Sequence, residues 1–177
     1  MENDLLLVRD RLLKEDLNIL YESRLRDKLT AVDTVCLLRL PHLIESGRIV
    51  YNRASYKRTA SWNVIQQSRL IESFLLDISI SPLALYQLDD ETDEIVDGEQ
   101  RVKAIINFLN GNFELEGLLL WQELNGMTYE DLPSKIKEGI ITNCFQTMTV
   151  LVNSICEFDP EIVKQTTYEY LNFRRLT

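Results

Sequence analysis

Five consecutive residues, Asp97-Gly98-Glu99-Gln100-Arg101, combine side chains and local geometry suited to chemistry. An apolar strand pattern precedes them and a helical pattern follows, so Gly98 lies in a strand-to-helix turn that allows close approach of a ligand. The first N–H groups of a helix lack acceptors within the helix, and the helix dipole favours anions there. Arg101, in the first helical turn, can bind phosphate oxygens in a forked geometry. These features predict a nucleotide-phosphate site.

The two acidic residues of the run extend this prediction to a metal ion. Asp97 or Glu99 could hold Mg²⁺ directly or through water, and Glu99 could instead orient an attacking water molecule. A second interpretation stays open, because the spacing of Asp97 and Gln100 also matches a capping box that only satisfies the end of a helix.

The pentapeptide stands within an ordered series of motifs that covers about residues 33–172. The other members of the series are residues 43–49, Tyr56-Lys57-Arg58 followed by Trp62, residues 67–76, Ser81-Pro82-Leu83, residues 108–115, and residues 124–133. Together they resemble the N-terminal domain of GmrSD-type restriction proteins, whose signature is DGQQR and which belong to the ParB/sulfiredoxin-like superfamily.

This resemblance implies an α+β fold, in which helices surround a small mixed sheet. It implies a domain that binds, and in many members hydrolyses, a nucleoside triphosphate (NTP) with Mg²⁺, in defence against foreign, often modified, DNA. Asp97, Gly98, Gln100 and Arg101 match the signature, in which Glu99 stands at the place of the first Gln, and Arg58 matches an upstream arginine. DNA is an implied partner. A nuclease domain or subunit is a second one, because the single histidine excludes an HNH-type nuclease within this chain.

Two departures from the family pattern support an alternative function. Glu99 replaces the first Gln of the signature, so that the run also resembles the Gly-Glu-Arg-Arg box of ParB proteins, which bind nucleotide through this region. In a later Phe-x-Arg-Leu-Asn motif, matched by residues 168–172, Tyr170 replaces the Arg. The alternative is a catalytically inactive DNA- or protein-binding module with the same fold.

Charge is distributed unevenly along this acidic chain, whose formal net charge is -9. Such a balance argues against a surface that binds nucleic acid everywhere, because phosphates are neutralised by Lys and Arg. Residues 46–71 nevertheless contain no acid, and the segment from residue 52 to 61 reads as a basic loop. The candidates for DNA contact are Arg53, Lys57 and Arg58, with an ordinary solvated loop as the alternative.

Strands and helices that must position these residues follow from hydrophobic periodicity. We expect a helical extension over residues 1–30 and a nucleotide-binding domain over residues 31–177. The expected helices are 3–29, 33–47 (capped by Asp33), 62–77, 99–109, short pieces within 129–139, and one from Asp159-Pro160 to Asn172. The expected strands are 48–51, 83–86, 94–96, 113–120 and 145–152, with a hairpin turn at 89–93.

Other residues indicate the setting of the protein rather than its chemistry. The three cysteines lie far apart without a CxxC pair, which favours buried free thiols in a reducing cytoplasm over a disulfide framework. No apolar run approaches the roughly 20 residues of a membrane span, so no membrane partner is expected. His42 is expected to pack or lie at the surface, and Trp62 to anchor the core, although it could stack on a base.

Overall fold

The computed structural model describes residues 14–19, 30–52, 61–151 and 159–173. Its centre is a five-stranded mixed sheet with the order β1-β5-β3-β4-β2. The strands are β1 (Thr30–Cys36), β2 (Ile49–Tyr51), β3 (Leu83–Gln87), β4 (Asp93–Asp97) and β5 (Cys144–Val150). The pairs β2–β4 and β3–β5 are parallel, whereas β1–β5 and β3–β4 are antiparallel.

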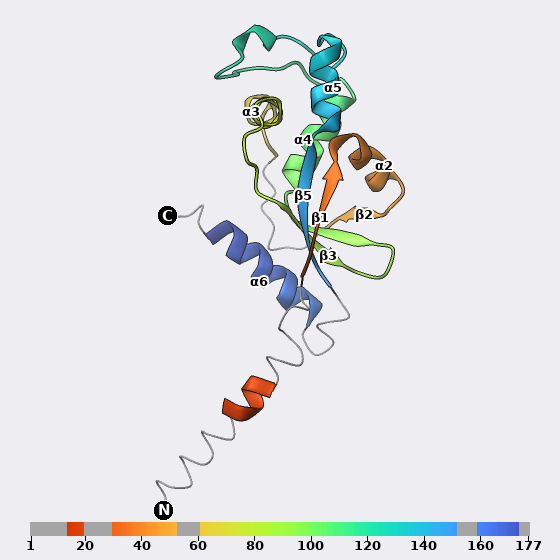
Figure 1. Cartoon of the computed structure of the whole chain (residues 1–177), viewed down its shortest axis with the longest axis vertical. Helices are drawn as coiled ribbons and strands as arrows, with labels where there is room; N and C mark the ends of the chain where they lie inside the picture. The colour runs from red at the N-terminus through yellow and green to blue at the C-terminus, as the bar shows by residue number, and fades with distance from the viewer. Residues whose placement is uncertain (1–13, 20–29, 53–60, 152–158, 174–177) are drawn as a thin grey trace, which may run out of the picture.

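Helices cover both faces of this sheet (Figure 1). They are α2 (Leu40–Glu45), α3 (Val64–Leu75), α4 (Glu99–Leu109), α5 (Ser134–Thr142) and α6 (Pro160–Phe173), with 3-10 turns η2 (Leu37–Arg39) and η3 (Gln122–Leu124). The alternation of side chains in β3 divides the core, since Leu83 and Leu85 pack with the helices α2 to α5, whereas Ala84 and Tyr86 pack with α6. The expected small mixed sheet surrounded by helices is therefore confirmed.

Most expected elements are present within a few residues of their predicted ends. The β3–β4 hairpin turns at exposed residues 89–91, where Asp89 Oδ1 accepts a hydrogen bond from the N–H of Glu91 at 2.8 Å. Asp159 likewise caps the first turn of α6 through the N–H of Glu161 at 2.8 Å. Residues 14–19 are helical, and the rest of the expected helix 3–29 lies outside the described residues. No helix in the described ranges is both long and apolar enough to cross a membrane.

The predicted start of the helix 33–47 at Asp33 is wrong, because residues 33–36 belong to β1, whereas its later part is present as η2 and α2. All of β1 pairs with β5, from Thr30 opposite Val150 to Cys36 opposite Cys144. Pairing with a distant strand overrides the local capping signal of Asp33, and β-branched residues in the segment suit a strand. Helical structure starts at Leu37, so Pro41 falls in the first turn of α2, where its missing N–H costs little.

The strand expected at residues 113–120 is also absent, and a buried carboxylate explains the observed conformation. Glu72 of α3 is 5% exposed and accepts hydrogen bonds from the N–H groups of Leu119, Leu120 and Trp121 at 2.8–3.1 Å. A side chain thus supplies the acceptors that a neighbouring strand would have supplied. Burial raises the pKa of Glu72, but the three N–H donors and Arg69 outweigh it, so that the net pKa is lowered.

Replacing Glu72 with Gln is expected to lower the free energy of unfolding by about 2–3 kcal/mol, because charge-assisted hydrogen bonds are lost and an amide group faces N–H donors. Since the folded-state pKa of Glu72 is lowered, its contribution is complete above its ordinary pKa of 4.5 and is lost as pH falls through the folded value. Urea titrations at several pH values measure both effects. Glu138→Gln, at an exposed position of α5, is the control; equal losses for both variants would contradict the assignment.

Candidate functional site

The turn between β4 and α4 forms the centre of the candidate site. β4 ends at Asp97, Gly98 is the N-cap residue with φ +102°, and α4 begins at Glu99. A bulge precedes the turn, because Ala84 pairs with Asp97 but Leu85 pairs with Ile95. A Cβ atom on Gly98 would lie 2.4 Å from Leu83 Cδ2. The left-handed backbone favours glycine here, and a larger residue would also displace the side chain of Leu83.

The capping-box interpretation of the signature is wrong. Gly98 rather than Asp97 is the N-cap residue, and it provides no side-chain cap. The side chain of Gln100 instead accepts a hydrogen bond from the N–H of Trp62 at 3.2 Å. Gln100 therefore holds the segment that precedes α3 rather than the end of its own helix.

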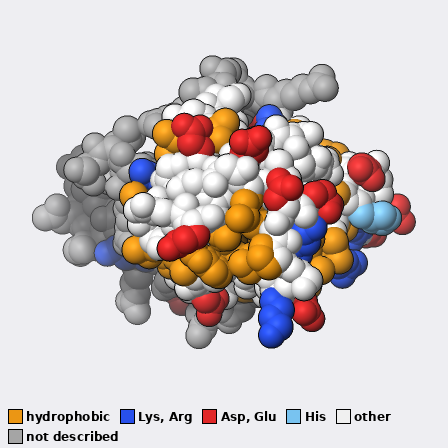
Figure 2. All heavy atoms as spheres, turned by 90° about the horizontal axis from the view of Figure 1, so that it is seen from above, with side chains coloured by type: hydrophobic (Ala, Val, Ile, Leu, Met, Phe, Trp, Pro, Cys, Tyr) orange, Lys and Arg blue, Asp and Glu red, His pale blue; other side chains and the backbone are white. Residues whose placement is uncertain are grey.

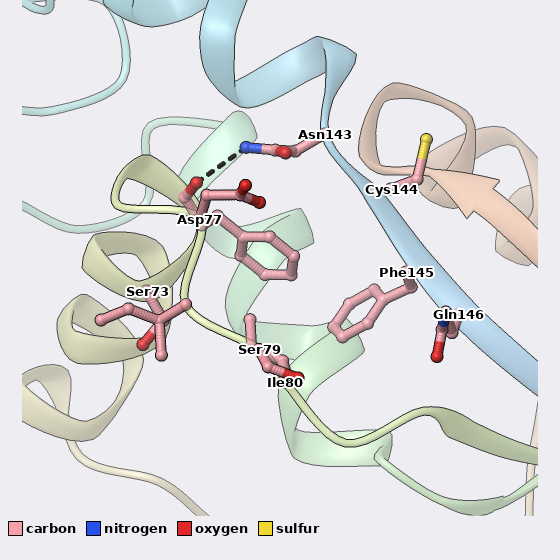
Figure 3. A pocket seen from close by; sticks show the side chains of 10 residues that line it. Ser73, Asp77, Ser79, Ile80, Asn143, Cys144, Phe145 and Gln146 are labelled. Carbon is pink, nitrogen blue, oxygen red and sulfur yellow. Dashed lines mark hydrogen bonds between the residues drawn. The ribbon is translucent and has the colours of Figure 1, made fainter.

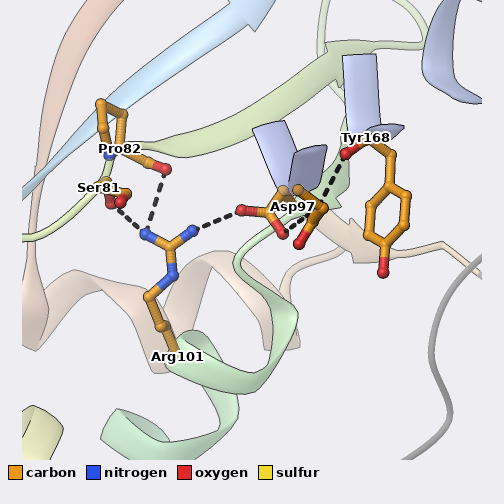
Figure 4. Close-up of polar contacts among 6 residues, drawn as sticks. Ser81, Pro82, Asp97, Arg101 and Tyr168 are labelled. Atoms are coloured by element: carbon orange, nitrogen blue, oxygen red, sulfur yellow. Dashed lines mark hydrogen bonds and ion pairs between the residues drawn. The ribbon is translucent and has the colours of Figure 1, made fainter. Parts of the chain in front are cut away.

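Arg101 points inward, toward the residues just before β3 and the last residue of β4 (Figure 4). The residue is 4% exposed, and its Nη2 donates to Asp97 Oδ2 at 2.8 Å. Its Nη1 donates to the carbonyl oxygens of Ser81 and Pro82, just before β3. The guanidinium group thus links the residues before the start of β3 to the end of β4, and its planar fork suits these acceptors.

The second oxygen of Asp97 faces the C-terminal helix. Asn172 of α6 lies with its Nδ2 3.4 Å from Asp97 Oδ1 and donates to the carbonyl oxygen of Tyr168 at 2.8 Å. This end of α6 is the later motif in which Tyr170 replaces an Arg. The structure therefore brings the Asn of that motif to the signature, a contact that spacing along the chain did not reveal. Nearer the start of α6, buried Lys164 binds Glu94 of β4 at 2.7 Å and fixes the helix on the sheet.

The outer side of the turn carries a more exposed set of charges. Glu99 Oε1 lies 2.6 Å from Lys103 Nζ, and the two side chains are 21% and 45% exposed. Lys103 Nζ lies 5.1 Å from the centre of the Tyr51 ring, which comes from the end of β2. Burial and the charge of Glu99 raise the pKa of the Tyr51 hydroxyl. Glu99 is therefore the more exposed of the two signature carboxylates, since the Asp97 side chain is 12% exposed.

The basic segment, which is the predicted loop from residue 52 to 61, is attached to this turn at both of its ends. β2 runs parallel to β4, with Tyr51 opposite Ile95, so that the chain leaves β2 at the same edge where β4 leads into the turn. At the other end, Trp62 is held by Gln100 and by Gln67, whose Nε2 donates to the Trp62 carbonyl at 3.0 Å. The side chains predicted to contact phosphate or DNA, Arg53, Lys57 and Arg58, lie outside the described residues.

Other predicted residues lie away from the turn. Trp62 is half-buried against the main core, as expected for an anchor, whereas base stacking by this residue stays a prediction. His42 is exposed on α2. On the face shown in Figure 2, acidic and basic side chains are mixed among hydrophobic ones and form no basic surface. Two arginines of the acid-free residues 46–71 donate hydrogen bonds to backbone carbonyl oxygens. Arg48 donates to the carbonyl of Asp90, and Arg69 donates to the carbonyl of Gly117.

A preformed metal cluster is absent from the described part of the chain, which contains no group of three or more His, Cys, Asp or Glu side chains that could hold an ion. Both Asp97 oxygens face protein donors, Arg101 and Asn172. Mg²⁺ bound with a nucleotide needs only one or two carboxylates, because phosphates and water complete its shell. Asp97 therefore fits a positioning role, and the more exposed Glu99 stays the predicted Mg²⁺ ligand.

Comparison with protein families identifies the relationship that the signature suggested. The model of the GmrSD restriction endonuclease N-terminal domain matches residues 40–177. The chain belongs to this family. A GmrSD-type domain is a component of restriction-like DNA defence. The match contains the signature turn, the basic segment and Asn172, whereas β1 precedes it. Comparison with curated proteins found no match.

Proposed function

We propose that this GmrSD-type domain binds an NTP with Mg²⁺ at the β4–α4 turn and thereby regulates a restriction-like system. The observation that carries the proposal is the attachment of the basic segment to the signature at both ends, through the β2–β4 pairing and the Gln100–Trp62 hydrogen bond. Ligands of α/β folds bind beyond the carboxyl ends of parallel strands, where β2 and β4 end here. The N-terminus of α4 supplies a favourable field for phosphate at the same place.

Each signature residue has a separate role in this proposal. The phosphates lie at Gly98 and Glu99, and Arg58 of the basic segment neutralises their charge. Glu99 holds Mg²⁺ or orients a water molecule for hydrolysis, which requires positioning and electrostatics rather than covalent chemistry by the protein. Arg101 and Asp97 keep the turn in shape from within, and Gln100 holds the end of the basic segment. DNA cleavage belongs to a separate nuclease domain or subunit.

The experiment is isothermal titration of the folded chain with ATP, GTP, CTP and UTP in Mg²⁺, together with a phosphate-release assay. At least one NTP is expected to bind, and Arg58→Ala is expected to weaken that binding by about tenfold or more, through loss of a charge-assisted contact. Glu99→Gln is expected to reduce the dependence of binding on Mg²⁺ and to slow any phosphate release.

The control is Lys135→Ala, which removes one positive charge from an exposed position of α5 and is expected to leave NTP affinity unchanged. Circular dichroism melts establish that each variant is folded. Absence of binding for all four nucleotides by the folded chain would overturn the proposal. Equal affinities for the Arg58→Ala variant and the unchanged chain would remove Arg58 from the site.

A further inference from the structure

The cysteines that the sequence separates by more than a hundred residues meet across two strands. Cys36 ends β1, Cys144 begins β5, and the two residues are direct partners in the antiparallel ladder. Their Sγ atoms lie 3.0 Å apart. Cys36 is half-buried and Cys144 is exposed, so the expectation of buried thiols is wrong for Cys144. The third cysteine, Cys156, lies outside the described residues.

The pairing geometry suits a covalent bond between the two sulfurs. The N–H of Leu37 donates to the carbonyl oxygen of Asn143 at 2.9 Å, so the next ladder bond joins the residues that flank the cysteines. Cys36 and Cys144 therefore form a non-hydrogen-bonded pair, in which opposed Cα atoms lie about 4.5 Å apart and side chains are closest. That separation is within the range spanned by disulfides. Side chains alternate along β5, so Cys144 projects away from the buried Phe145 (Figure 3).

We propose that Cys36 and Cys144 form a reversible oxidation site, at which a peroxide converts the two thiols into an intrachain disulfide. The thiolate of the exposed Cys144 attacks a peroxide oxygen and becomes a sulfenic acid, with release of water. The Cys36 thiol then attacks this sulfur, forms the S–S bond and releases a second water. In total, two thiols and one hydrogen peroxide give one disulfide and two water molecules, and a dithiol reductant reverses the change.

The surroundings of the pair predict the rate and the consequence of oxidation. The hydrogen bond with Cys36 and burial raise the pKa of the Cys144 thiol, so the reaction is expected to accelerate as pH rises. The bond would close a loop that contains β2 to α5 and the candidate nucleotide site. Closing so long a loop restricts the unfolded chain strongly, and the oxidised protein is expected to melt about 10 °C above the reduced one.

The test uses the full chain with Cys156→Ser, so that the pair is the only source of thiols. After treatment with hydrogen peroxide and alkylation under denaturing conditions, the expected product is unalkylated, weighs two hydrogen atoms less and contains a cross-linked peptide with Cys36 and Cys144. Dithiothreitol is expected to restore two alkylation sites and the lower melting temperature. Adding Cys144→Ser to this background is expected to abolish both the cross-link and the shift.

Two results would overturn the proposal. The first is full alkylation of both cysteines after peroxide treatment that suffices to oxidise an exposed thiol in a control protein. The second is over-oxidation of Cys144 to sulfinic acid while Cys36 stays alkylatable, since this shows that Cys36 does not resolve the sulfenic acid. Cys36→Ala provides an independent variant with a small side chain, in which a persistent melting shift would likewise contradict the assignment.

Discussion

Replacement of Arg101 with alanine is expected to lower the free energy of unfolding by about 3–5 kcal/mol, the usual cost of removing one member of a buried ion pair. The change leaves Asp97, whose side chain is 12% exposed, without its cationic partner. It also removes a donor from the carbonyl oxygens of Ser81 and Pro82. Unfilled space beside Phe145 adds to the loss, because the guanidinium carbon lies 6.0 Å from that ring.

The same helix provides a matched control for this prediction. Lys103 pairs with Glu99 at the same i,i+4 spacing, but at the surface. Lys103→Ala is therefore expected to change stability by at most about 0.5 kcal/mol. Denaturant titration of both variants measures the difference between a buried and an exposed pair, and similar values for the two would refute the structural role of Arg101.

A double-mutant cycle identifies the origin of the Arg101 effect. Asp97→Asn and Arg101→Ala each leave a buried charged group without the opposite charge of its partner. The double variant is therefore expected to cost about 1–3 kcal/mol less than the sum of the two single changes. Additive costs would show that the two side chains do not stabilise one another. Arg101→Lys keeps the charge without the fork and is expected to recover only part of the loss.

Replacement of Gly98 with alanine is the second large expected effect, at about 2–5 kcal/mol. The left-handed backbone at φ +102° costs a residue with a Cβ about 1–2 kcal/mol. The contact with Leu83 at 2.4 Å, and the Arg101 Nη2 atom at 3.0 Å, add about 1–3 kcal/mol of overpacking. Thermal and urea unfolding of the Gly98→Ala variant measure the total.

Gly47 separates the two contributions to this cost. It has φ +73°, and a Cβ there would meet nothing within 4 Å. Gly47→Ala is therefore expected to cost only the backbone part, about 1–2 kcal/mol. If Gly98→Ala proves no more costly than Gly47→Ala, packing against Leu83 and Arg101 is not what requires glycine in the signature.

These two predictions change how variants of the signature should be interpreted. Loss of NTP binding in Arg101→Ala would not show that Arg101 contacts phosphate, because the turn itself depends on this side chain. Glu99 and Arg58 are better probes of ligand contact. Glu99 is more exposed than Asp97, and its pair with the exposed Lys103 is expected to contribute little to stability.

The amino-acid sequence alone predicted much of the local structure around the site. β4, the glycine turn and α4 follow from apolar periodicity, and Gly111, with φ +70°, follows the end of α4 as expected. Asp159-Pro160 likewise begins α6. These features depend on residues close along the chain, whose side-chain types directly determine backbone geometry. The motif series also indicated the family, which the match over residues 40–177 confirms.

Only the tertiary structure decided which partners the signature residues have. The sequence gives Arg101 a place in the first turn of α4, but the packing of β3 turns it toward Ser81 and Pro82 instead of outward. Gln100 finds Trp62, and Asp97 lies near Asn172, across separations of 38 and 75 residues. Pairing with β5 likewise converts the segment at Asp33 from an expected helix into β1. In each case distant groups meet in the folded chain, and their hydrogen bonds and burial outweigh the local preferences that the sequence displays.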